Sequence, residues 1–234
     1  MGDGVSDELA PGEGGALTKF SRRRELAIAV AGYGIYLLVR RAVCTAEGRR
    51  RARRNGERIL ALERRLGLAL EAPVQRWFLR RPRLVHALNA GYAAFNVTLT
   101  VGWLWRLFMR SDDGYYALRR AAVIAYLAPQ PIFLLFPAEP PRRLDGFVDT
   151  VSDLGPVSLD SPLLVRFYNP VAAMPSLHCA FAVVTAGSMA ERSNPLSRAY
   201  PPLVALAVVA TGNHYLLDVV GGAALGLVAR RLAG

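Results

Sequence analysis

The chain is organised around one stretch, NPVAAMPSLH at positions 169–178, which opens a long apolar run. Pro175 suits the first turn of a helix, because its missing N–H group would have no partner there. The backbone N–H groups of Ser176 and Leu177, with the helix dipole behind them, would then form an anion site. The sequence therefore predicts a helix that opens at Pro175 and presents Ser176 and His178 to the same bound oxygen atoms.

Two further stretches carry chemically useful side chains. HYLLD places His214 and Asp218 at i and i+4, so that both side chains lie on one helix face. PPRR ends in Arg142 and Arg143. Two histidines, an aspartate, a serine and an arginine pair together indicate a site for phosphoryl transfer.

Hydrophobic residues make up 53% of the chain and gather into runs instead of spreading evenly. Several runs approach the roughly 20 residues that a helix needs to cross a hydrocarbon core of about 30 Å, although the first and fifth are short. We therefore expect an all-α fold, an integral membrane six-helix bundle. The candidate spans are Glu25–Val39, Leu84–Phe108, Ala117–Phe136, Val171–Ala190, Leu196–Thr211 and Asn213–Leu232.

The net charge of +11 would suggest nucleic acid as the partner of a soluble protein. Here the arginines lie mainly beside the apolar runs, so anionic lipid headgroups are the expected partner and nucleic acid is not. The two cysteines, Cys44 and Cys179, are too few for a disulfide framework or a thiolate metal site.

The chain divides into three parts. Residues 1–18 are rich in glycine and acidic residues and lack periodicity, which predicts a disordered tail. Residues 19–83 hold the first span and an arginine-rich amphipathic helix at 56–68, which is expected to lie in the membrane interface; a solvated helix that covers the bundle is the alternative. Residues 84–232 form the membrane-embedded catalytic core, whose long polar connection at 137–170 suggests a lid or binding loop.

The last two spans leave almost no room to turn. Thr211, Gly212 and Asn213 must provide the break, since Gly212 can take a backbone conformation closed to other residues. His178 and His214 then lie near span ends on one side of the membrane, together with the arginine pair. The loop arginines of the core favour an extracytoplasmic site, whereas counting all arginines narrowly favours the opposite side.

We predict that His214 attacks a phosphorus atom, because imidazole can form a covalent intermediate that divides one difficult displacement into two easier ones. Asp218 would accept the proton of the far ring nitrogen and hold the neutral tautomer. His178 would donate a proton to the departing oxygen and later accept one from the incoming acceptor.

The expected substrate-binding residues are Arg142, Arg143, Ser176 and Asn213, since the arginine fork suits phosphate. These cations make a metal unnecessary, and no cofactor is expected. A metal site built from both histidines and Asp218 is the alternative. For each histidine taken alone, a structural, hydrogen-bonded role is the alternative.

The PSLH and HYLLD stretches together resemble the paired signatures of the type 2 phosphatidic acid phosphatase superfamily. Within it, NP at 169–170, MPSLH at 174–178, the tyrosine after His214 and FPAEPPR at 136–142 are most similar to the inositol phosphorylceramide synthase-like (inositolphosphotransferase) branch. The resemblance covers residues 84–232. It implies that the downstream histidine is the nucleophile, that the upstream one is the general acid, and that the site faces the extracytoplasmic side of a bacterial plasma membrane.

Two departures leave the substrate open. The phosphatase members carry a lysine, six residues and then Arg-Pro, and also a Ser-Arg pair ahead of the second histidine; here PPRR and Val208 stand in those places. One phosphate clamp must therefore come from elsewhere, such as Arg166 or the arginines at 40–83. We expect a phosphatase or phosphotransferase that acts on a membrane phospholipid or polyprenyl phosphate. Release of free phosphate is the alternative to headgroup transfer, and a non-catalytic lipid-binding membrane protein is the second alternative.

Overall fold

The computed structural model describes residues 19–92, 96–154 and 166–234, so the tail predicted for 1–18 lies outside the described residues. The described chain is all-helical, as predicted, and its only β contact is an isolated bridge between Ala138 and Ala172. The helices are α1 (Arg22–Val43), α2 (Ala46–Arg65), α3 (Glu71–Leu79), α4 (Pro82–Ala90), α5 (Asn96–Met109), α6 (Tyr115–Leu127), α7 (Gln130–Leu135), α8 (Thr150–Leu154), α9 (Leu177–Ala190), α10 (Leu196–Ala210) and α11 (Leu216–Ala233), and a 3₁₀ turn covers Pro141–Arg143.

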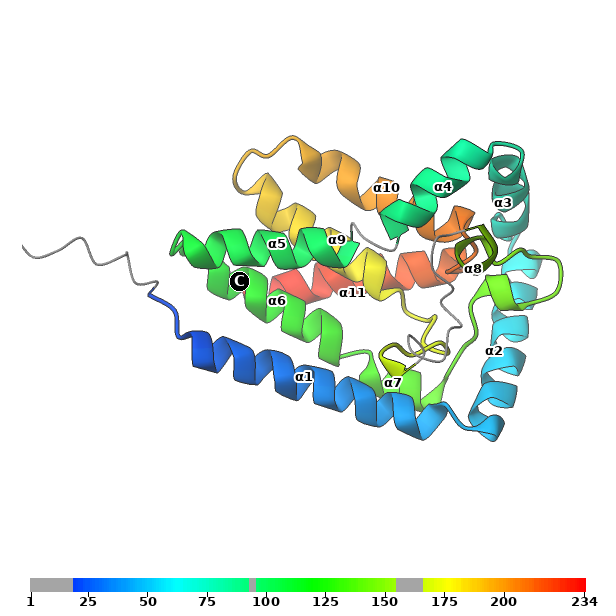
Figure 1. The fold of residues 1–234 in the computed structure, drawn as a ribbon, viewed down its shortest axis with the longest axis horizontal. Helices are drawn as coiled ribbons and strands as arrows, with labels where there is room; N and C mark the ends of the chain where they lie inside the picture. Colours follow the sequence, from blue (N-terminus) through cyan, green and yellow to red (C-terminus); the bar gives the residue numbers. More distant parts are fainter. Residues whose placement is uncertain (1–18, 93–95, 155–165) are drawn as a thin grey trace, which may run out of the picture.

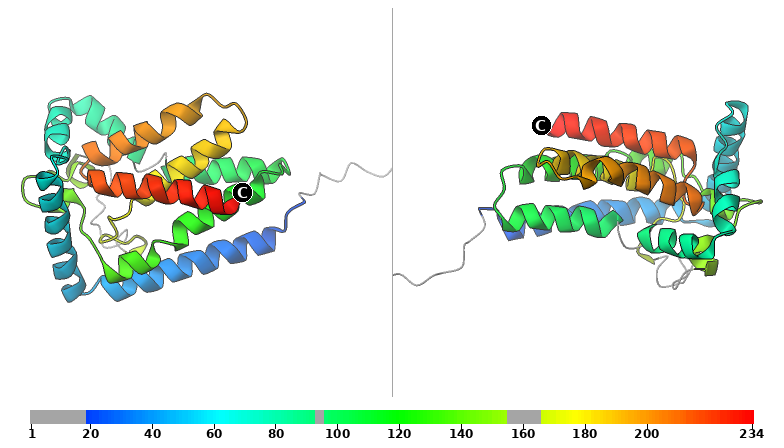
Figure 2. Two further views of the ribbon diagram at one scale, coloured as in Figure 1. Left: turned by 180° about the vertical axis from the view of Figure 1, so that it is seen from behind. Right: turned by 90° about the horizontal axis from the view of Figure 1, so that it is seen from above.

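Helix α9 is the central element of the fold, packed against α5, α6, α10 and α11. These helices form a bundle, and α1 lies along its outside, where it contacts α6 and α7 (Figure 1). Helix α2 runs across one end of the bundle, and the two views of Figure 2 place it beyond the start of α11. The histidine stretches at the starts of α9 and α11 therefore meet at the end that α2 covers.

Helices α9 and α11 approach closely because glycine lies between them. A Cβ atom on Gly222 would lie 2.2 Å from the carbonyl oxygen of Ser176, and one on Gly226 would lie 2.7 Å from that of Ala180. Small residues four apart clear one helix face and let two backbones pack together. This contact fixes the start of α9 against the first turns of α11.

The six-span membrane bundle is not confirmed. Among the described helices only α1 is long and apolar enough to cross a membrane, and only 6% of its apolar window is buried within the protein. Helices α9 and α10 are apolar but have 14 and 15 residues, which is about 21–23 Å against the roughly 30 Å of a hydrocarbon core. The expected third span is divided into α6 and α7 next to Pro129 and Pro131. The expected second span covers α4 and α5, and residues 93–95 between them lie outside the described residues.

Helix α2 begins at Ala46, earlier than the predicted amphipathic segment, and it covers the end of the bundle. The side-chain amide of Asn55 donates to the carbonyl of Pro137 at 2.8 Å, and the carbonyl of Ala52 accepts from the N–H of Glu139 at 3.1 Å. The buried residues recur at helical spacing: Ala52, Asn55, Gly56, Ile59, Leu60 and Glu63. The helix is therefore packed into the structure along one face. The burial of Glu63 on this face was not predicted from the sequence.

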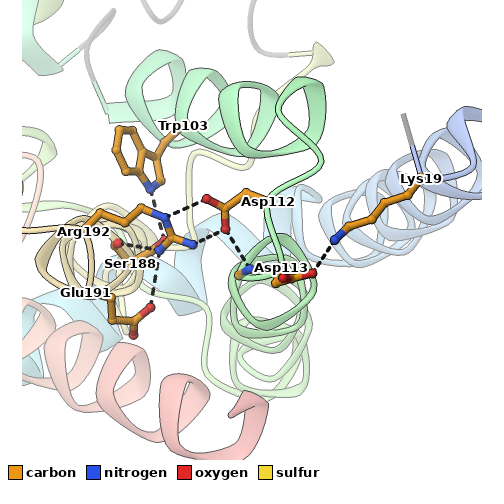
Figure 3. A network of polar contacts seen from close by, with 8 residues as sticks. Lys19, Trp103, Asp112, Asp113, Ser188, Glu191 and Arg192 are labelled. Carbon is orange, nitrogen blue, oxygen red and sulfur yellow. Dashed lines mark hydrogen bonds and ion pairs between the residues drawn. The ribbon is translucent and has the colours of Figure 1, made fainter. Parts of the chain in front are cut away.

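A polar network holds the opposite end of the bundle (Figure 3). Arg192, just beyond α9, forms an ion pair with Asp112 from the turn before α6, and its Nη1 donates to the carbonyl of Ser188 at 2.9 Å. Trp103 of α5 donates from Nε1 to the Ser188 hydroxyl at 3.1 Å. Because Arg192 joins the turn before α6 to α9, and Trp103 joins α5 to α9, these three helices are tied together at the end away from α2.

The packing of α2 can be tested by substituting Gly56. A Cβ atom there would lie 2.6 Å from the Tyr215 hydroxyl and 2.9 Å from the Glu139 carbonyl oxygen. We expect Gly56→Ala to destabilise the protein by about 1–3 kcal/mol, because overpacking forces the backbone or Tyr215 to move. Thermal unfolding of the purified protein measures this.

The matched control is Gly34→Ala in α1, where a Cβ atom would meet nothing within 4 Å. There alanine should leave stability unchanged or raise it by up to about 1 kcal/mol, since it limits the unfolded chain. Equal melting temperatures for the two variants would show that α2 is not packed as described.

Candidate active site

His178, His214 and Asp218 form one hydrogen-bonded line at the covered end of the bundle. Nδ1 of His178 lies 3.2 Å from Nε2 of His214, and Nδ1 of His214 lies 3.3 Å from Oδ2 of Asp218. Asp218 is fully buried and His214 is 4% exposed. The structure thus brings together two imidazoles that are 36 residues apart in the sequence.

The hydrogen-bond directions along this line follow from Asp218. Its Oδ2 also accepts the N–H of Tyr215 at 3.1 Å, so the carboxyl oxygen is an acceptor and Nδ1 of His214 is the donor. In a neutral His214 ring Nε2 then carries the lone pair, and Nδ1 of His178 donates to it; the backbone of Ala173 is a further hydrogen-bond partner of the His214 ring. This arrangement gives His214 a nucleophilic nitrogen and places a transferable proton on His178. It also engages both ring nitrogens of His214 within the protein.

The start of α9 differs from the prediction. The helix begins at Leu177, with Ser176 as its N-cap, so the prediction of Pro175 in the first turn is wrong. Ser176 is fully buried: its hydroxyl accepts from the N–H of Cys179 at 3.3 Å, and its N–H donates to the carbonyl of Asp218 at 3.0 Å. Of the two amides predicted to bind an anion, only that of Leu177 is therefore left for a ligand.

Arg142 and Arg143 diverge instead of acting as a pair. Arg142 is 5% exposed, forms an ion pair with Asp149, and lies close enough to His214 to act on its charge. Arg143 lies near Glu139 and Cys44 on the side of α2, and its carbonyl accepts from Arg53. The structure therefore brings Arg142, and not Arg143, to the imidazoles.

The turn before His214 positions Arg142. Gly212 has φ +70°, the left-handed region that glycine adopts without strain, and its carbonyl accepts from the N–H of Arg142 at 2.8 Å. Asn213 is 4% exposed, and its side-chain amide donates to the hydroxyl of Thr211 at 2.8 Å. Asn213, expected to bind substrate, thus uses its side-chain amide to brace the turn.

Substrate must separate the two histidines. Attack needs about 3–3.5 Å between the nucleophile and phosphorus, and proton donation needs a further ~2.6–3.2 Å from the leaving oxygen to the acid. The present 3.2 Å between His178 and His214 leaves no room for a phosphorus atom on the line between them. Either ring can turn, but Asp218 holds His214, so His178 is the ring expected to move.

Four residues at this end were not foreseen as part of the site. The ring of Tyr92 lies 4.7 Å from that of His178, Asp149 pairs with Arg142, and Glu63 and Glu71 bond to the first amides of α11. Glu63 could have been found, since it lies four residues after Ile59 and three after Leu60, on the buried face of α2. No local pattern marks the other three.

Arg166, named as a substitute phosphate clamp, is exposed. Among the described residues, no group of three or more His, Cys, Asp or Glu side chains is arranged to hold a metal ion.

A comparison with protein-family models matches residues 57–232 to the PAP2 superfamily. Neither the curated proteins nor the solved structures contain a match to this chain. The matched range begins within α2 and includes every residue of the line from His178 to Asp218. It also includes Arg142.

The hydrogen-bond directions can be tested with nitrogen NMR on protein carrying labelled histidine. The chain has three histidines, so Gln replacement of the exposed His86 simplifies assignment. We expect His214 to be protonated at Nδ1 and unprotonated at Nε2. In Asp218→Asn the amide can donate to Nδ1, so the proton should move to Nε2. A wild-type His214 protonated at Nε2 would contradict the assignment.

Proposed function

The chain belongs to the PAP2 superfamily, and from this membership and the site geometry we propose a membrane-embedded enzyme that cleaves or transfers the phosphorylated headgroup of a lipid. Membership supports phosphatase- or phosphotransferase-type chemistry. The observation that carries the mechanism is the line from His178 through His214 to Asp218, with 3.2 Å and 3.3 Å between successive atoms.

In the first half-reaction His214 is the nucleophile. The lone pair on its Nε2 forms a bond to phosphorus, the bond from phosphorus to the leaving oxygen breaks, and that oxygen keeps the electron pair. His178 enters this step as an imidazolium with both ring nitrogens protonated; it gives its Nδ1 proton to the leaving oxygen, which departs as an alcohol, and the ring becomes neutral. The carboxylate of Asp218 stabilises the positive charge that develops on the His214 ring through the Nδ1–H bond.

The second half-reaction reverses these roles. An acceptor hydroxyl, from water or an alcohol, attacks phosphorus while His178 takes up its proton. The bond between nitrogen and phosphorus breaks, and its electron pair returns to Nε2 of His214. The enzyme is restored with the same proton count, because the proton given to the leaving group is replaced by the one taken from the acceptor.

Arg142 and the amide of Leu177 are the proposed ligands of the non-bridging oxygens. The Arg142 guanidinium already faces Asp149, so a phosphate must share or displace that carboxylate. Arg143 would act at longer range, because it lies near Glu139 and Cys44. Ser176 and Asn213 shape the site through their contacts within the protein.

Among acceptors we favour an alcohol over water. His214 and Asp218 are buried beneath α2, and water has to be kept out if a phosphorylated intermediate is to meet another acceptor. This burial supports the phosphotransferase branch that the sequence resembles, in which an inositol-phosphate-type headgroup would be moved. A lipid phosphatase that releases free phosphate is the competing outcome.

The proposed membrane placement rests on two surfaces. Helix α1 exposes apolar residues such as Leu26, Val30 and Leu38 toward the outside of the bundle. The far face of α2 carries arginines that suit anionic lipid headgroups. Helix α1 would then lie in the hydrocarbon, α2 in the interface, and the active site at the extracytoplasmic headgroup level.

The nucleophile is tested with lipid labelled at the headgroup phosphate. Rapid quenching should trap label on the wild-type protein, and His214→Ala should trap none and lose turnover by about 10⁴-fold or more, because the covalent route is removed. Lipid binding should be largely kept. His86→Gln, an exposed histidine of α4, is the control and should behave as wild type. Unchanged turnover in His214→Ala would refute the mechanism.

The acceptor is tested by product analysis. Labelled phospholipid is supplied with and without a lipid alcohol, and the products are separated as free phosphate or phosphodiester. A new phosphodiester that depends on the alcohol supports transfer. Free phosphate alone, at the same rate with or without alcohol, identifies a phosphatase. Binding without either product would identify a non-catalytic lipid-binding protein.

A further inference from the structure

Two buried carboxyl groups bond to successive amides at the start of α11. Glu71 Oε1 accepts the N–H of Leu216 at 2.7 Å, and Glu63 Oε1 accepts the N–H of Leu217 at 2.6 Å. Both glutamates are 0% exposed. Fully buried glutamates are rare unless a specific partner holds them, so these two are unusual for residues outside the imidazole line.

The two glutamates reach the same point because a tight turn joins their helices. Glu63 lies in the last turn of α2, and Glu71 is the first residue of α3. Between them Gly67 has φ +69°, and the N–H of Leu68 donates to the carbonyl of Glu63 at 2.8 Å. The turn between α2 and α3 thus faces the start of α11.

The pair is suited to hold one proton. The second oxygen of each carboxyl group is buried with no N–H or O–H donor among the described residues. Two adjacent buried carboxylates repel, so one binds a proton and can donate it to the other. Burial, with the carboxyl of Glu71 beside it, raises the pKa of Glu63 to about 8. The pair then carries one negative charge, which suits a helix N-terminus.

The start of α11 carries half of the active site. The next carboxyl group along it is Asp218, whose Oδ2 accepts from Tyr215 N–H and from Nδ1 of His214. With Glu63 and Glu71 in place, the first three amides of this helix start are all bonded to carboxyl oxygens. These amides therefore cannot bind phosphate, whereas the Leu177 amide at the start of α9 is available to bind it.

We propose that Glu63 and Glu71 are positioning residues of the active site: they hold the start of α11 so that Asp218 stays on Nδ1 of His214. Neither glutamate touches the reacting atoms. The proposal rests on the proposed role of His214 as nucleophile. Under this proposal α2 and α3 help to position the catalytic residues, in addition to any contact that their arginines make with lipid.

The kinetic test compares Glu63→Ala with Glu63→Gln. Alanine leaves the Leu217 amide without its acceptor, so the start of α11 shifts and kcat should fall on the order of 100-fold with KM little changed. Glutamine keeps an acceptor for Leu217 and a donor for Glu71, so kcat should return to within a few-fold of wild type. The matched control is Glu57→Ala, an exposed glutamate of the same helix that pairs with Arg53.

Wild-type kcat in folded Glu63→Ala would overturn the proposal, as would an equal loss in Glu63→Ala and Glu63→Gln. The His214 nitrogen resonances give a readout that does not depend on turnover. Glu63→Ala should shift or broaden the Nδ1–H signal, and Glu57→Ala should not. If no lipid phosphate is turned over by wild type, the proposed function fails, and this spectrum still decides the role of Glu63.

Stability against pH tests the shared proton. Glu63 faces Glu71 from α3 and Asp218 and Tyr215 from α11. Burial raises the pKa of Glu63 from the ~4.3 of an unfolded glutamate to about 8. Between these two pKa values the folded state binds more protons than the unfolded state, so stability falls as pH rises. The melting temperature of wild type should therefore drop more between about pH 5 and pH 8 than that of Glu63→Gln. Parallel curves of melting temperature against pH for wild type and Glu63→Gln would show that Glu63 and Glu71 do not share a proton.

Discussion

A backbone hydrogen bond joins the two halves of the active site. The N–H of Ser176 donates to the carbonyl of Asp218 at 3.0 Å, and Gly222, one turn further along α11, leaves room for the Ser176 backbone. Two helix starts are thereby locked side by side. Each can then point an imidazole at the other, and neither His178 nor His214 could hold its place if α9 slid along α11.

Much of this site follows from sequence, because its parts lie in short local patterns. The spacing of His214 and Asp218 predicts their contact correctly, although not its setting: α11 begins at Leu216, so His214 lies before the helix and not on its face. The apolar runs predict helices throughout. The placement of both histidine stretches at one end follows from the odd number of helices between them. The two arginines were harder to predict, because they lie in a 3₁₀ turn: Arg142 lies near His214, whereas Arg143 lies near Glu139 and Cys44.

The features that could not be predicted from the sequence depend on contacts between distant segments of the chain. Nothing near Ser176 in the sequence indicates that its N–H is bonded to Asp218, so the predicted anion site was larger than the one observed. Charged residues on an amphipathic helix are ordinarily assigned to its exposed face, which is why Glu63 was overlooked. The six predicted spans are not confirmed, because an apolar run is the same whether the helix is buried in protein or in lipid, and because proline can divide such a run into shorter helices.

The central claim is that phosphorus is bonded at Nε2 of His214, between the two imidazoles. A crystal structure with orthovanadate, which mimics five-coordinate phosphorus, tests this most directly. The account predicts vanadium bonded to Nε2 of His214, with Asp218 still on Nδ1, Arg142 on an equatorial oxygen, and the His178 ring moved away from its 3.2 Å contact to bond an axial oxygen. Vanadate bound away from His214, with the two rings still in contact, would contradict it.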